Sequence, residues 1–220
     1  MNNETQQNKH IAIIAVAAFF IILIAWTGAR LLWLSLESHF EITKIEWVEF
    51  TYWLIVKAIL WIMPAIWMLK RCGKASEIFR IRSWRKTLSF GLGIGGALLV
   101  MSVGSRIITD NWSMPYNSLI SFLGVVIIAP IFEEFLVRGA VLSSLKRKVT
   151  FIPANLLAAL LFTLLHFPGW YFNGELITML LNPLNGALAI FIIGFLCGLA
   201  AEKGESLFAA IIVHMLNNLF

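Results

Sequence analysis

The run NSLISFLGVVIIAPIFEEFLVRGAV, Asn117–Val141, decides the fold class of this chain. It is long enough to cross a membrane as a helix, because about 20 residues span a hydrocarbon core. Two adjacent carboxylates, Glu133 and Glu134, nevertheless lie inside it. Charged side chains at membrane depth usually face a bundle interior or a wet cavity and mark a working site. The run therefore predicts a membrane-spanning helix and indicates where chemistry takes place.

The rest of the chain has the composition of a membrane protein. Of its 220 residues, 60% are hydrophobic and 13% are charged, and the mean hydropathy is +0.84, which excludes an ordinary water-soluble domain. The sequence predicts an all-α, polytopic transmembrane bundle of about seven or eight helices that forms a single domain over residues 1–220. The predicted helices cover about residues 11–36, 51–69, 87–109, 117–143, 151–167, 184–201 and 206–220. The stretch Gly174–Pro183 is either a re-entrant turn or the start of a broken helix.

Charge is distributed along the chain in a way that indicates topology. Basic residues cluster beside the ends of apolar runs, seven of them within 70–86 and three within 146–148, whereas acidic residues occupy the alternate loops. This pattern argues against a nucleic-acid partner, although the net charge is +5. By the positive-inside rule we expect a multi-pass protein of the cell membrane with its basic loops and its N-terminus, including Lys9, in the cytoplasm.

The two adjacent glutamates are expected to differ in role. Glu134 and Arg138 are four residues apart, so they share a helix face and can pair directly. Glu133 is rotated from Glu134 by about 100°, which leaves it as the carboxylate whose proton can respond to a substrate. The alternative is that all three residues form a structural charge cluster between helices.

Polar residues in two later apolar runs complete a possible site. His166 follows Phe162 by four residues; taken alone, it is typical of a helix-end histidine bound to a backbone carbonyl. His214 and Asn218, also four apart, can donate to an oxyanion or connect membrane helices. Combined with Glu133, they favour hydrolysis by an activated water, without a side-chain nucleophile. Counted from the predicted cytoplasmic ends, His214 lies ~12 Å deep, Glu133 ~16 Å and His166 ~24 Å, so tilted or offset helices would be needed to gather them.

Taken together, these residues resemble the signature of the CAAX protease and bacteriocin-processing (CPBP or Abi) family of intramembrane endopeptidases. The three matching motifs are Glu133-Glu134-x-x-x-Arg138, Phe162-x-x-x-His166 and His214-x-x-x-Asn218. The resemblance covers residues 117–220, the catalytic-motif half, whereas the first three spans match only in hydropathy. It implies a membrane peptidase related to the type II CAAX prenyl endopeptidase.

The resemblance also implies a role for each matching residue. Glu133 and His166 would activate the water, and His214 and Asn218 would bind the oxyanion. The remaining charged motif residues, Glu134 and Arg138, would support them. The implied enzyme is a glutamate-type endopeptidase that needs no metal and no other cofactor.

Two other mechanisms use the same part of the chain. Glu133, His166 and His214 could form a His₂Glu zinc site, although the H-E-x-x-H pattern of many zinc peptidases is missing. Cys197 could be a nucleophile, but no nearby residue in the sequence would activate it, and a buried membrane cysteine is usually inert.

The function that these patterns favour is cleavage of a peptide or a membrane-anchored protein near the membrane surface, in a cavity among the last four helices. The resemblance associates it with prokaryotic peptide processing or bacteriocin immunity. A non-enzymatic immunity or scaffold protein that binds a peptide or a sensor is the alternative. A small transporter is a third class, which the absence of an inverted repeat in the sequence disfavours. The oligomeric state is left open.

Overall fold

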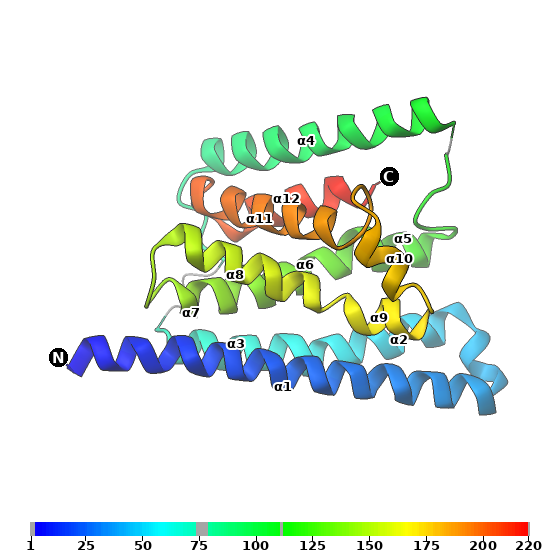
Figure 1. The fold of residues 1–220 in the computed structure, drawn as a ribbon, viewed down its shortest axis with the longest axis horizontal. Helices are drawn as coiled ribbons and strands as arrows, with labels where there is room; N and C mark the ends of the chain where they lie inside the picture. The colour runs from blue at the N-terminus through cyan, green and yellow to red at the C-terminus, as the bar shows by residue number, and fades with distance from the viewer. Residues whose placement is uncertain (1–2, 74–78, 111, 220) are drawn as a thin grey trace.

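The predicted all-helical architecture is confirmed. The computed structural model describes residues 3–73, 79–110 and 112–219, and within these ranges it contains helices and connecting turns but no strand. Residues 74–78, which include Lys74 of the basic loop, lie outside the described residues. The long helices run roughly parallel to one another, with α1 on one outer side of the bundle and α4 on the other (Figure 1).

The helical elements follow one another along the whole described chain. They are α1 (Asn3–His39), η1 (Glu41–Lys44), α2 (Glu46–Lys57), η2 (Ala58–Ile62), α3 (Met63–Arg71), α4 (Trp84–Thr109), α5 (Leu119–Phe122), η3 (Leu123–Ile128), α6 (Ala129–Glu134), η4 (Phe135–Leu142), α7 (Ser143–Leu145), α8 (Phe151–Leu164), α9 (Phe167–Phe172), α10 (Leu176–Leu181), α11 (Ala187–Lys203) and α12 (Leu207–Asn217).

Five continuous helical stretches are long and apolar enough to cross a membrane. They are His10–His39, Glu46–Arg71, Trp84–Thr109, Leu119–Leu145 and Phe151–Phe172. With the shorter α11 and α12 they coincide with the seven apolar runs, because hydrophobic length is a local property of the sequence. The stretch Gly174–Pro183 contains α10, a separate helix of six residues between α9 and α11.

Glycines allow the close packing of the last helices. A Cβ added at Gly95 of α4 would lie 3.0 Å from the Cα of Val213 in α12, and one at Gly198 of α11 would lie 1.8 Å from Oδ1 of Asn155 in α8. Small residues spaced four apart let membrane helices approach in this way. The first approach holds α12, which carries His214, against α4, and the second holds α11 against α8.

Two of the long helices contain widened π-helical segments: η2 lies in Glu46–Arg71, and η3 and η4 both lie in Leu119–Leu145. Pro64 follows η2 in the first turn of α3, and Pro130 follows η3 in the first turn of α6. Proline has no N–H to donate to the preceding turn, and a local π segment is one way in which a helix adapts to such an interruption. The third segment, η4, begins directly after Glu134, just as η2 begins directly after Lys57.

The two ends of the bundle differ in their connections (Figure 1). The N-terminus and the α3–α4, α7–α8 and α11–α12 connections lie at one end, which we call the basic end because Lys and Arg are concentrated there. The α1–α2, α4–α5 and α10–α11 connections lie at the opposite end. At the basic end the α11–α12 connection is set back from the α7–α8 connection, so residue counts from the helix ends do not start at one level.

Candidate active site

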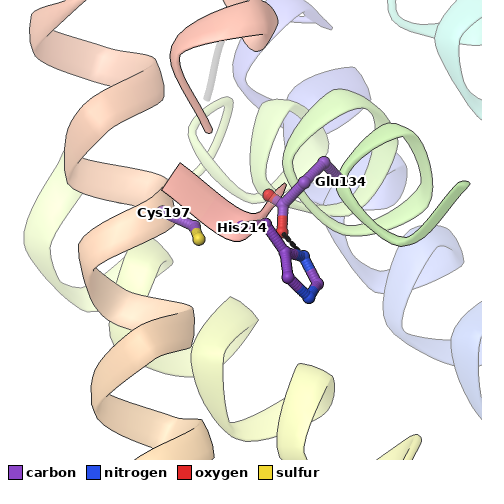
Figure 2. Close-up of side chains that lie close together, drawn as sticks. All are labelled: Glu134, Cys197 and His214. Carbon is purple, nitrogen blue, oxygen red and sulfur yellow. Dashed lines mark hydrogen bonds and ion pairs between the residues drawn. The ribbon is translucent and has the colours of Figure 1, made fainter. Parts of the chain in front are cut away.

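Glu134 is the fully buried centre of a charged cluster. Its Oε1 accepts a hydrogen bond from Nη1 of Arg138 at 3.0 Å, which confirms the predicted pairing of these residues. The same oxygen lies 2.8 Å from Nδ1 of His214, a contact that the sequence analysis did not predict. Figure 2 shows Glu134 of α6 and His214 of α12 directed toward each other. Glu134 therefore connects α12 to the Glu134–Arg138 pair.

Arg138 extends this cluster to two further helices. Its Nη2 donates a hydrogen bond to the carbonyl oxygen of Gly194 in α11. Its guanidinium lies 4.5 Å from the centre of the Phe162 ring in α8, a cation–π distance. Only 3% of Arg138 is exposed. The Arg138 side chain thus connects α6, α8 and α11.

Glu133 lies between two nitrogen atoms from distant parts of the chain. Its Oε2 is 3.8 Å from Nε2 of His214, and its Oε1 is 3.9 Å from Nζ of Lys57 in α2. Both distances exceed those of direct hydrogen bonds. The carboxylate oxygens consequently keep their capacity to accept a hydrogen bond from water or to take up its proton.

His166 has a defined arrangement of its ring nitrogens. Nδ1 lies 3.0 Å from the carbonyl oxygen of Phe162. Because a carbonyl oxygen can only accept, Nδ1 carries the hydrogen, and in the neutral ring Nε2 then carries the lone pair. The contact with a backbone carbonyl, considered above as the non-catalytic interpretation, therefore leaves Nε2 able to act as a base.

Asn218 is the C-cap residue of α12. Its Nδ2 donates a hydrogen bond to the carbonyl oxygen of Val125 at 3.0 Å, and its Oδ1 accepts one from Asn217 at 3.2 Å. A carboxamide nitrogen has two N–H groups, so the contact with Val125 occupies only one of them. The second remains a possible donor to a bound group.

The structure places the four residues of the predicted catalytic set on the wall of one cavity of about 770 Å³. They are Glu133, His166, His214 and Asn218. The expected location among the last four helices is wrong in two respects: α2 forms another wall with Trp53, Leu54 and Lys57, and no described residue of α11 lines the cavity. Lys57 is a cavity residue that was not predicted. Its signal was a single cation within the apolar run 51–69, which is costly at membrane depth.

The possible metal ligands gather in a different combination from the His₂Glu set that the sequence analysis considered as an alternative. Among the described residues, ligand atoms of Glu134, Cys197 and His214 lie within 4.8 Å of one another, and all three are buried (Figure 2). Glu134 already binds His214 and Arg138, so a cation here would compete with the guanidinium. This donor set fits a metal poorly. Cys197 is fully buried and is not among the described residues that line the cavity.

The fold and its cavity define a multi-pass membrane protein with a polar site at the centre of a helical bundle. Residues 115–220 match the model of the family described as Type II CAAX prenyl endopeptidase Rce1-like. The match confirms the resemblance to the CAAX protease family, and this family implies a membrane protease of the CAAX endopeptidase type. No match was found among curated proteins or among solved structures.

Proposed function

We propose that this protein is an intramembrane endopeptidase that hydrolyses a peptide bond with a water activated by Glu133 and His166. The observation that carries the proposal is the convergence of residues from all three motifs on one cavity. Water activation requires a base within reach of the water, and Glu133 and the Nε2 of His166 can each provide one. The contact between Nδ1 of His166 and a carbonyl supports this role, because it keeps the lone pair on Nε2.

His214 and Asn218 are proposed to stabilise the oxyanion that forms after water attack. A donor is effective when it is held in place before charge develops. Glu134 holds Nδ1 of His214, so donation through Nε2 requires a ring protonated at both nitrogens. The carboxylate oxygens of Glu133 and Glu134 lie 3.8 Å from Nε2 and 2.8 Å from Nδ1 of that ring, respectively. Asn218 is anchored by one N–H and can offer the other.

The remaining charged residues are proposed to support these four. Arg138 holds Glu134, which in turn orients His214. This scheme makes the enzyme a glutamate-type peptidase, because the carboxylate of Glu133 takes up the proton of the attacking water and returns it to the leaving amine as the C–N bond breaks. Residues 117–220 carry all of the proposed catalytic groups within a single domain over residues 1–220.

The proposed substrate is a peptide or a segment of a membrane-anchored protein. Prokaryotic peptide processing or bacteriocin immunity is the biological setting that the family resemblance favours. The cavity has both polar and apolar walls, as a site that binds a peptide backbone beside apolar side chains requires. A non-enzymatic immunity or scaffold protein would use the same cavity only for binding.

Cleavage of membrane-associated peptides by the purified protein tests the proposal. We expect wild-type protein in detergent to release fragments and the isosteric Glu133→Gln variant to release none, while both bind peptide. The matched control is Glu37→Gln, which changes an exposed glutamate on α1 and should cleave like wild type. Equal fragment release by wild type and Glu133→Gln would contradict the mechanism. A Glu133→Gln variant that keeps the full cellular phenotype would favour the non-enzymatic function.

A further inference from the structure

We propose that substrate reaches the cavity from the side of the membrane opposite the basic loops, so the substrate is a peptide segment exposed on the non-cytoplasmic side. That the bound molecule is a substrate rests on the proposed function. The side from which the cavity is reached does not depend on it. Three observations carry it: where the cavity meets the surface, what closes its other end, and how charge is distributed along the bundle.

The cavity meets the surface at the end of the bundle away from the basic loops. Lys44, Glu49 and Asn117 line it and are exposed. Lys44 ends η1, Glu49 lies in the first turn of α2, and Asn117 lies just before α5. These segments adjoin the α1–α2 and α4–α5 connections at that end (Figure 1). The cavity therefore runs from this end inward to Glu133.

The path from Glu133 toward the basic end is closed by packing. The chain continues from Glu134 into η4, and all residues of η4 are buried. Leu136, Val137 and Val141 lie in a cluster of buried residues that also includes Met68 and Leu69 of α3. Protein interiors of this kind are close-packed and leave few voids larger than a water molecule. A peptide from the basic end would have to displace this packing.

Charge assigns the two ends to the two sides of the membrane. Besides the basic loops at 70–86 and 146–148, Lys203 ends α11 at the basic end. Acidic residues dominate the other end, namely Glu37, Glu41, Glu46, Glu49 and Glu175. Short loops rich in Lys and Arg stay in the cytoplasm. The opening near Lys44 and Asn117 consequently faces the non-cytoplasmic side.

The walls indicate which peptide segment fits. At the opening, the described lining residues include two glutamates, Glu46 and Glu49, and one lysine, Lys44, whose ammonium already binds Glu41 at 2.7 Å. Farther in, the lining becomes apolar, with Phe50, Leu54, Val125 and Ile128 among its residues. An apolar segment with a basic residue on its outer side complements this arrangement, because the acidic opening attracts a cation.

Thiol labelling from one side of the membrane tests the side of access without any substrate. Ser121 lines the cavity, and Lys148 is exposed in a basic loop. The variants Ser121→Cys and Lys148→Cys are each treated in intact cells with a small charged methanethiosulfonate that does not cross membranes, and again after permeabilisation. The unmodified chain is the blank, since Cys72 and Cys197 are both buried. We expect Ser121→Cys to react in intact cells and Lys148→Cys to react only after permeabilisation.

The opposite labelling pattern, or reaction of Ser121→Cys only after permeabilisation, would overturn the proposal. A second experiment measures cleavage of a quenched fluorescent peptide that has an apolar segment and one basic flank. It uses purified Ser121→Cys and Lys148→Cys, each before and after attachment of a bulky maleimide. We expect attachment at position 121 to reduce cleavage at least tenfold and attachment at position 148 to leave it unchanged. Labelling from outside without cleavage by any form of the protein would uphold the side of access and reject the protease function.

Discussion

The ammonium of Lys57 lies 3.9 Å from the carboxylate of Glu133 and joins the first half of the chain to the motif half. Lys57 also lies 5.0 Å from the centre of the Trp61 ring, and its side chain is only 17% exposed. The cavity region therefore contains two pairs of opposite charge, Glu134 with Arg138 and Glu133 with Lys57. This balance lowers the cost of two adjacent carboxylates in a membrane.

The first prediction concerns this pair. Lys57→Met should lower the unfolding temperature, because it leaves Glu133 without its cation. Adding Glu133→Gln to that variant should restore part of the loss, with a coupling energy of about 1–2 kcal/mol. Thermal unfolding of the four proteins in one detergent measures the coupling. Lys44→Met is the control, since Lys44 is exposed and pairs with exposed Glu41; additive effects of the two substitutions at 57 and 133 would refute the pairing.

The second prediction concerns Arg138. Arg138→Ala should destabilise the fold by about 3–5 kcal/mol, because it leaves Glu134 as an uncompensated buried charge. It also removes the contacts with Gly194 and Phe162. Yield and unfolding temperature of the purified variant provide the measurement. A variant that is as stable as wild type and loses only turnover would place Arg138 in the reaction itself.

The third prediction compares two glycines of α4. Gly95→Ala should cost about 1–3 kcal/mol, because overpacking forces backbone shifts and the new Cβ would lie 3.0 Å from the Cα of Val213. Gly93→Ala should be neutral or stabilising by about 0.5–1 kcal/mol, as for a helix-interior glycine without steric conflict. At Gly93 the Cβ would meet no described atom within 4 Å other than those of its chain neighbours and of the surrounding helix backbone. Equal unfolding temperatures for the two variants would contradict the packing of α4 on α12.

The fourth prediction concerns the oxyanion donors. His214→Ala and Asn218→Ala should each lower kcat by ~10²–10³-fold with little change in KM, because the donors act mainly on charge that develops in the transition state. Steady-state kinetics with a quenched peptide provide the measurement. A large rise in KM at unchanged kcat would instead assign both side chains to ground-state binding.

The fifth prediction concerns metals. Activity should survive EDTA and phenanthroline, because Glu133 and His166 can remove the proton from water without a Lewis acid. Metal analysis of the same active preparation accompanies the assay. Stoichiometric zinc that is lost together with activity on chelation, and that restores activity when returned, would reject the mechanism.

The parts of the structure that the sequence predicted are those that depend on neighbouring residues. The seven apolar runs became helices because continuous apolar sequence at membrane depth must satisfy its backbone hydrogen bonds within the helix; five of the resulting stretches are long enough to span a membrane. The Glu134–Arg138 pair formed as predicted because residues four apart share a helix face. His166 also lies against Phe162, four residues earlier, with the ring centres 5.0 Å apart.

The parts that were missed depend on how distant segments come together. His214 meets Glu134 across 80 residues of sequence, and no spacing rule connects them. Lys57 was not predicted as a site residue, although a lone cation in an apolar run is as costly at membrane depth as the carboxylate of Glu133. The residue counts that separated His166 from His214 in depth assumed level helix ends, whereas the ends are staggered (Figure 1).

Because of the π-helical segments, the direction in which the charged side chains point depends on the number of residues in each segment as well as on residue identity. Lys57 directly precedes η2 and Glu134 directly precedes η4, and each such segment holds an extra residue in its turn. Loss of one residue from η4 would let the helix close to regular α-geometry and rotate its two sides by about 100° relative to each other. The number of residues in η4 thus sets the rotation of Glu133, which lines the cavity, relative to the part of the helix that follows η4.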